Sequence, residues 1–231
     1  MLYRYETHCH TKEGSRCSRL SGEALVRLYK KLGYTGIVIT DHFFNGNTTV
    51  PRTGMAWEDR VEMFVTGYRN AKAEGDKLGL DVFFAWEYSY FQSDFLTYGL
   101  DWNWLLAHPD VCDWTPHQYF DRVKEDGAFL VHAHPLRTAR YIKHISLFPD
   151  KIDTVEVDNA SMQDVVNERD HWYAESFGFY KTAGSDTHFV ENRHRFSGID
   201  SPIRFTDIRQ YGEELKKGNL KLFSLNLDGL L

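Results

Sequence analysis

The sequence alternates short β-rich runs with helical patterns, and this alternation restricts the possible folds more than any other feature. Runs such as TGIVIT and AFLVHAH are rich in β-branched and aromatic residues, which favour strands. Between them lie segments such as SGEALVRLYKKLG, in which Ser21 is a capping residue and Gly33 is suited to end the helix. Because no break in composition interrupts the pattern, we expect one α/β domain over residues 1–231, with a mostly parallel, helix-covered sheet.

The periodicity predicts individual elements. Strands are expected at residues 2–7, 35–40, 81–87, 128–134, 152–157 and 221–225, with a further run within 179–188. Helices are expected at residues 21–33, 56–79, 115–127, 161–178 and 206–218. In a βα barrel the carboxyl ends of the strands meet at one face, where active sites are built.

Acidic and imidazole side chains follow these β-runs at their carboxyl ends. The clusters are His8 with His10, Asp41 with His42, Glu87, His132 with His134, and Asp186 with His188. Any one of them is compatible with a cap, a turn or an ordinary surface residue. Five clusters at one face are hard to explain by chance, so the sequence predicts a metal site there.

The candidate ligands are imidazoles and carboxylates. Alternate residues of an extended strand share a face, so His8 and His10 can reach one ion while Cys9 points away. Such ligands suit Zn, Mn or Fe in a site with open positions. The candidates are too many for one ion, so we expect two or three divalent ions, and Glu87 is a candidate bridge between two of them.

Five motifs, in order over nearly the whole chain, resemble those of the PHP (polymerase and histidinol phosphatase) family: HCH, TDH, AWE, HAHP and GSDTH. The resemblance implies a distorted seven-stranded (β/α)7 barrel, in agreement with the independent strand count, and a metal-dependent phosphoesterase activity. It also implies a ligand set: His8, His10, Glu87 and Asp186 for one metal, Glu87 and His134 for a second, and His42 and His188 for a third.

The third metal site departs from the family's pattern. Many members carry an Asp or His soon after the first motif to complete that site, whereas this chain has TKEGSRCS. Ser15 or Arg16 stands about there, and Glu13 is the only nearby carboxylate. Two alternatives follow for His42 and His188. They either bind a third ion or, without one, protonate the leaving oxygen.

Further positions around the motifs need an assignment. Members often carry a histidine in a hairpin after the glutamate; here Asp94 takes that place, and we predict it to be a ligand of the second metal. His108 also lies in an Ala-His-Pro sequence, but His134 follows the clearer β-run and is therefore the predicted ligand. We expect His132 to support a ligand and not to bind the metal itself.

The sequence also suggests roles for residues near the predicted metal site, and it leaves alternatives open for several of them. Asp41 is expected to orient His42, whereas Glu156 and Asn159 end a strand at the same face and either orient ligands or contact substrate. The Trp-rich segment 98–114 is either a lid or core packing, and packing is favoured because buried aromatics usually supply core area.

The function favoured by this pattern is hydrolysis of a small phosphomonoester or phosphodiester by a metal-activated hydroxide. Cations must meet the charge of the transferring group, and Arg137, next to a predicted ligand, is the first choice. The other candidate arginines are Arg16, Arg140, Arg193 and Arg195. Two alternatives stay open: a metal-dependent amidohydrolase and a noncatalytic PHP-like partner module.

Charge and cysteine content restrict partners and location. A net charge of -6 and a pI near 6.0 argue against a general nucleic-acid binder, so the expected partner is a small phosphorylated substrate. No apolar run is long enough to span a membrane. The odd number of cysteines, Cys9, Cys17 and Cys112, argues against a disulfide framework and favours the cytoplasm.

Overall fold

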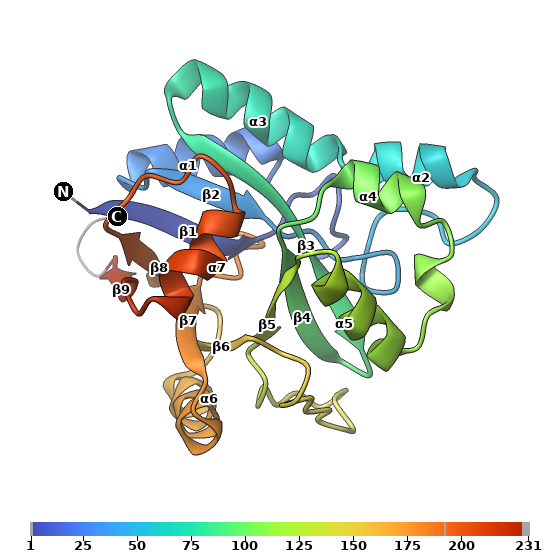
Figure 1. Ribbon diagram of the computed structural model, residues 1–231. Coiled ribbons are helices and arrows are strands. Elements are labelled where there is room, and N and C mark those ends of the chain that lie inside the picture. The colour runs from blue at the N-terminus through green and yellow to red at the C-terminus, as the bar shows by residue number, and fades with distance from the viewer. Residues whose placement is uncertain (1, 192, 228–231) are drawn as a thin grey trace.

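The described strands form one continuous, strongly curved sheet (Figure 1). The computed structural model describes residues 2–191 and 193–227. Nine strands lie within these residues, in the order β7-β6-β5-β4-β3-β2-β1-β8-β9. They are β1 (Tyr3–Cys9), β2 (Gly36–Ile39), β3 (Asp81–Tyr90), β4 (Ser93–Tyr98), β5 (Phe129–Ala133), β6 (Thr154–Asn159), β7 (Tyr180–Gly184), β8 (Arg195–Ser201) and β9 (Lys221–Asn226).

The sheet is nearly closed into a barrel. Strand β7 packs against β1 and β8, and the Ser185 hydroxyl after β7 accepts from Ser197 N–H (2.9 Å) and donates to Ser197 O (3.0 Å) on β8. Pairing is parallel for β1-β2-β3 and β5-β6-β7, and antiparallel for β3-β4-β5 and β1-β8-β9. The expectation of a mostly parallel sheet is therefore wrong, and the predicted count of seven strands is not confirmed. Strands β4 and β8 are the two that the sequence pattern did not reveal.

Helices connect and cover the strands (Figure 1). They are α1 (Gly22–Lys31), α2 (Trp57–Phe64), α3 (Thr66–Leu78), α4 (Trp102–Ala107), α5 (Pro116–Glu125), α6 (Asp164–Phe177) and α7 (Arg209–Lys216), with a 3-10 turn at Val111–Asp113. Ser21 caps α1 as predicted, because its side chain accepts from Ala24 N–H. Within the described part of the chain, no helix is both long and apolar enough to cross a bilayer.

The continuous helix expected at residues 56–79 is wrong, because the chain breaks at Val65 into α2 and α3. The new helix begins with Thr66 and Gly67, and both residue types weaken a helix interior. A side chain at Gly67 would lie 2.0 Å from Thr11 Oγ1. The glycine thus lets the start of α3 press against the loop that follows β1, which carries part of the candidate site.

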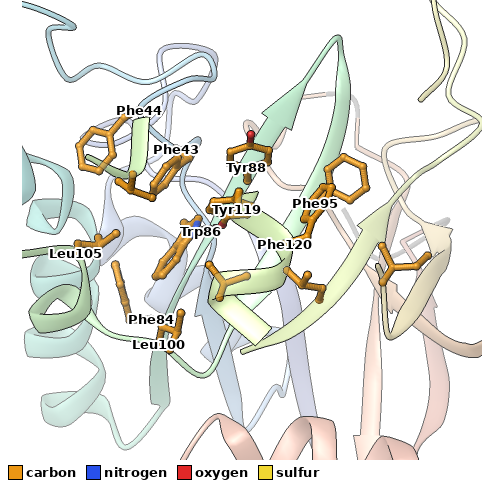
Figure 2. Close-up of a cluster of buried hydrophobic side chains, with 14 of the residues drawn as sticks. Phe43, Phe44, Phe84, Trp86, Tyr88, Phe95, Leu100, Leu105, Tyr119 and Phe120 are labelled. Carbon is orange, nitrogen blue, oxygen red and sulfur yellow. Dashed lines mark hydrogen bonds between the residues drawn. The ribbon is translucent and has the colours of Figure 1, made fainter. Parts of the chain in front are cut away.

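A large aromatic cluster fills the space between β3, β4 and the helices α2, α4 and α5 (Figure 2). Trp86, which is fully buried, stacks on Phe43 (5.6 Å between ring centroids) and on Trp104 (5.9 Å). Trp102 also packs against this cluster, next to Phe84. The Trp-rich segment 98–114 therefore packs against the core, as favoured from the sequence, and stiffens the outer side of the strands that carry the site.

Candidate metal centre

The five predicted clusters converge, and backbone contacts hold them together. Four follow strand ends, whereas Glu87 lies within β3, which continues to Tyr90 and not to the end predicted at Glu87. Asp186 N–H donates to His8 O (2.7 Å), which joins the residue after β7 to β1. Glu87 N–H donates to Asp41 O (3.0 Å), and Phe43 N–H donates to Glu87 O (2.8 Å), which joins the end of β2 to β3. The separation of the candidate ligands is thus set by the sheet and not by a mobile loop.

Four of the predicted ligands form the innermost group. His8 Nε2 lies 3.3 Å from Glu87 Oε1 and 3.5 Å from Asp186 Oδ1. His10 Nε2 lies 3.1 Å from His8 Nε2 and 3.3 Å from Asp186 Oδ1. All four side chains are buried. The structure therefore brings together the set that the resemblance implied for a first metal.

The far side of each ring fixes its orientation. His8 Nδ1 contacts Glu156 Oε1 (3.0 Å), a carboxylate that can only accept, so this nitrogen carries the proton. His10 Nδ1 contacts Ser15 Oγ (3.1 Å), whose own hydrogen is donated to Asp41 Oδ1 (2.7 Å). His10 Nδ1 must therefore donate as well. In the neutral rings both Nε2 atoms then carry the lone pair and face the same space, as metal ligands require.

A second group surrounds the other side of Glu87. His134 Nε2 lies 3.6 Å from Glu87 Oε1, and ligand atoms of Glu87, Asp94 and His134 all lie within 4.8 Å of one another. Asp94 accepts from Ser89 Oγ (2.7 Å) and from Arg137 Nη2 (2.8 Å). Asp94 therefore lies beside Glu87 and His134, as predicted. It also binds Arg137, the arginine predicted to meet the charge of the phosphoryl group.

A third group faces the open side of the centre. Nitrogen atoms of His10, His42 and His188 lie within 4.8 Å of one another, and the His10 and His188 rings stack at 4.3 Å. His42 Nε2 also contacts the sulfur of Cys17 at 3.1 Å. His42 and His188 are therefore together as predicted, and a cysteine that was not predicted joins them.

The charges within the centre are strongly coupled. Burial raises the pKa of Glu87, but His42 and the other imidazoles around it outweigh burial and hold that pKa well below its usual value. The pKa of Asp186 is also held low, because His8 and His188 outweigh burial. Burial and the neighbouring His188 and His42 lower the pKa of His10 well below its ordinary value. The carboxylates in turn outweigh burial at two other imidazoles: Glu156 and Asp186 raise the pKa of His8, and Glu87 raises the pKa of His42. The centre therefore presents ionised carboxylates, with His10 as the imidazole held neutral.

Two predicted ligands adopt left-handed backbone conformations. His134 has φ 32° and Asp186 has φ 51°, values that side chains other than glycine rarely adopt. Both residues follow immediately after or close to a strand end, β5 and β7. The turn at His134 breaks the strand's alternation and explains why His132, two residues earlier, does not share its surroundings.

His132 belongs to the core. Its ring is fully buried and stacks on Phe95 (4.4 Å), and neither ring nitrogen has a hydrogen-bond partner among the described residues. The expected support of a ligand by His132 is therefore wrong: the contact is apolar. His108, the alternative to His134, stacks on Trp104 (4.2 Å between ring centroids) and contacts its carbonyl oxygen within the Trp-rich segment.

Residues outside the motifs position the ligands. Glu6 is fully buried and accepts from His8 N–H and Ser185 N–H, both at 2.8 Å, so it fixes the ends of β1 and β7. Sequence reasoning missed it, although a glutamate within a buried β-run is a signal that could have been used. Glu156 contacts His8, and Asn159 donates to Glu156 Oε2 (2.8 Å), so both orient a ligand.

Asp41 acts on His10 as well as on His42, the ligand expected. Its carboxylate accepts from Thr11 N–H (2.7 Å), Thr11 Oγ1 and Ser15 Oγ, and burial raises its pKa to about 6. Through Ser15 it orients His10. The expected link to His42 runs through its backbone: the same Ser15 Oγ also accepts from His42 N–H (3.0 Å).

The ligands lie beside a pocket of about 600 Å³. His42, Glu87, Asp94, His134, Arg137, Asp186 and His188 line it, together with Cys17 and the aromatic residues Phe91, Tyr141 and Phe189. Two other candidate arginines are engaged elsewhere: Arg193 donates to Ser185 O and Arg195 pairs with Asp158 (3.3 Å). Arg137 is the candidate arginine whose guanidinium faces this pocket.

Two observations show that the residues fit divalent cations. His8 Nε2 and His10 Nε2 lie 3.1 Å apart, and each ring is held at its Nδ1 atom, so both Nε2 atoms are available to one cation. Glu87 Oε2 lies 2.5 Å from His42 Nδ1, and imidazoles of His8, His10 and His134 lie within 3.6 Å of the same carboxylate. A buried carboxylate surrounded by imidazoles is typical of a metal site.

Comparison with known proteins gives no match to a family model and none to a curated protein. Solved structures do match. A two-domain protein from Bacteroides vulgatus ATCC 8482, containing a predicted PHP-like metal-dependent phosphoesterase, superposes with a TM-score of 0.72 at 14% identity, over 96% of this chain. This chain has the fold of PHP-like metal-dependent phosphoesterases. It spans 65% of the Bacteroides protein.

Two further solved structures resemble the fold of this chain. A candidate metal-dependent phosphoesterase from Bifidobacterium adolescentis ATCC 15703 has a TM-score of 0.52 at 17% identity and covers 80% of this chain, which covers 87% of it. An amidohydrolase from Chromobacterium violaceum has a TM-score of 0.53 at 12% identity, with 94% and 97% coverage of the two chains. The fold is therefore common to phosphoesterases and to a protein named as an amidohydrolase.

Proposed function

We propose that this chain is a metal-dependent phosphoesterase that hydrolyses a small phosphomonoester or phosphodiester. The observation that carries the proposal is the surroundings of Glu87: imidazoles of His8, His10, His42 and His134 contact this one buried carboxylate, and Arg137 faces the same pocket. A carboxylate with ligand groups on both sides is suited to bridge two cations, and the adjacent guanidinium is suited to a phosphoryl group.

Different residues of the chain would bind the two ions and orient the ligands. His8, His10, Glu87 and Asp186 would hold one divalent ion, and Glu87, Asp94 and His134 a second. Bound ions of this kind lower the pKa of water toward about 7 and so supply hydroxide at neutral pH. Glu156 and Ser15 keep the lone pairs of His8 and His10 directed inward, so that the site needs no rearrangement when the phosphoryl group arrives.

Arg137 would contact the phosphoryl oxygens. Asp94 and the carbonyl oxygen of Gln92 hold its Nη2 at 2.8 Å and 3.4 Å, while its Nε has no partner among the described residues. The guanidinium is thus anchored through Nη2 at the wall of the pocket. Transition states of phosphoryl transfer depend mainly on such positioning and charge.

Arg137→Lys is expected to lower kcat/KM for an aryl phosphate by roughly 10- to 100-fold, since a hydrogen bond to a charged group contributes about 1.5–3 kcal/mol. Lysine keeps the charge but loses the planar fork that binds two phosphoryl oxygens. Steady-state kinetics on the metal-loaded variant measure the loss. Arg140→Lys is the matched control, because Arg140 is exposed three residues later, and its kinetics should stay close to wild type.

Metal content and hydrolysis test the function directly. Protein purified without chelator is analysed for metals and then assayed with an aryl phosphate and an aryl amide, before and after addition of Mn or Zn. We expect at least two ions per chain and metal-restored phosphate release. Amide hydrolysis without phosphate release would favour the amidohydrolase. A folded protein that stays inactive toward both after Mn, Zn and Fe addition would favour the noncatalytic module.

A further inference from the structure

We propose that Cys17 is a metal ligand, whose thiolate completes with His42 and His188 a third cation site on the open side of the centre. A site with one sulfur and two imidazoles takes a borderline cation such as Zn²⁺ or Fe²⁺ in preference to Mg²⁺. The inference depends on the proposed function only because it concerns the same metal centre. Its evidence is the geometry of the loop after β1 and of the strand ends beside it.

The sulfur lies among imidazoles. Cys17 Sγ is 3.1 Å from His42 Nε2, and it also contacts the His188 side chain. Nitrogen atoms of His42 and His188 fall within 4.8 Å of each other and of a His10 nitrogen. The segments after β2 and β7, two strands that both pack against β1, and the loop after β1 thus bring two imidazoles and a thiol together, with the fully buried His10 behind them.

The backbone on both sides of Cys17 is fixed, so the position of the sulfur is a property of the fold. On one side, Arg16 N–H donates to Asn47 O at 3.0 Å. On the other, Arg19 N–H donates to His188 O at 2.8 Å, and the Ser18 hydroxyl donates to the same oxygen at 3.1 Å. The loop is tied to the segment that carries His188. Cys17 is therefore held against the histidines and does not merely pass near them.

A second observation concerns the two edges of the His42 ring. Glu87 is only 1% exposed, and its Oε2 atom lies 2.5 Å from His42 Nδ1. On the opposite edge, His42 Nε2 contacts the Cys17 sulfur. A carboxylate that holds one ring nitrogen directs the other nitrogen toward a metal, so Glu87 would orient His42 Nε2 toward a cation shared with Cys17.

The assignment also accounts for the departure from the family's pattern. Of the residues that the sequence offered for this position, Ser15 is taken by His10 and Asp41, and Glu13 turns away to Gly22 N–H (3.2 Å). Cys17 stands where a ligand is needed. With a third ion present, His42 and His188 act as ligands, and the alternative role as proton donors to the leaving oxygen is not needed.

Cobalt substitution tests the proposal spectroscopically. Chelator-treated protein is titrated with Co²⁺, and a thiolate ligand is expected to produce a near-ultraviolet charge-transfer band that imidazole and carboxylate ligands do not give. Cys17→Ser is expected to lose this band and to bind one ion fewer per chain. Cys112→Ser is the matched control: Cys112 is also exposed but lies in the 3-10 turn, and this variant should keep both.

Alkylation gives an independent readout. Iodoacetamide labelling followed by peptide mass spectrometry should show Cys17 protected in the Zn-loaded protein and labelled after chelation, with Cys112 labelled in both states. Equal labelling of Cys17 in both states, with no charge-transfer band, would overturn the proposal. Phosphate release in such a protein would leave the phosphoesterase standing, whereas a band and protection without phosphate release would uphold the ligand and count against the function.

Discussion

Replacing Glu87 by glutamine is expected to cost more than about 100-fold in phosphoesterase activity and to remove bound metal. Changes to residues that only orient a ligand typically lower metal affinity or activity by about 10- to 100-fold, and Glu87 is itself the shared carboxylate. Glutamine keeps the shape of the side chain, but its NH2 group would present hydrogens where a cation needs a lone pair. Elemental analysis and kinetics on the same preparation measure both effects.

The control for Glu87→Gln is Glu168→Gln, which removes an exposed carboxylate on α6. It makes the same chemical change away from the centre, so its metal content and activity should match those of wild type. Thermal unfolding of both variants checks that each is folded. If Glu87→Gln retained full metal content and turnover while folded, the bridging role of this carboxylate would be wrong.

The strand ends of the candidate site could be predicted because two local signals coincide there. His8 and His10 continue a β-run with the period of two that puts both rings on one face, and Asp186 comes just after β7. Glu87 lies within β3, just past the part that pairs with β2. Each of these residues is positioned by its own strand. The sequence around it therefore carries most of the information about where it lies.

Features that depend on contacts between distant segments could not be predicted in this way. Strand β8 pairs with β1 although it contains Gly198 and two serines, which weaken the strand pattern. Position 198 has no room for a larger residue, because a Cβ atom there would lie 2.2 Å from Tyr5 O. Cys17 was missed for a similar reason: its backbone is fixed by bonds to Asn47 and His188, and neither contact is visible in the local sequence.

Gly184→Ala is expected to disrupt the metal centre by displacing Glu156 or His8. Gly184 ends β7, and a Cβ atom there would lie 2.6 Å from both Glu156 Oε1 and the Cβ atom of His8. Both distances are shorter than real contacts allow, so the Glu156 to His8 hydrogen bond or the strand spacing must give way. We expect metal affinity to fall by about 10- to 100-fold and the free energy of unfolding to drop by about 1–3 kcal/mol. Metal titration and chemical denaturation measure the two losses.

Gly178→Ala separates the loss of metal affinity from simple destabilisation. Gly178 ends α6 with φ 69°, and a Cβ atom there would meet nothing within 4 Å, so alanine strains the backbone by about 1–2 kcal/mol without touching the centre. Both variants should therefore be less stable, but only Gly184→Ala should bind metal more weakly. Equal metal affinities for the two variants would mean that the contact of Glu156 with His8 does not control the lone pair directed into the centre.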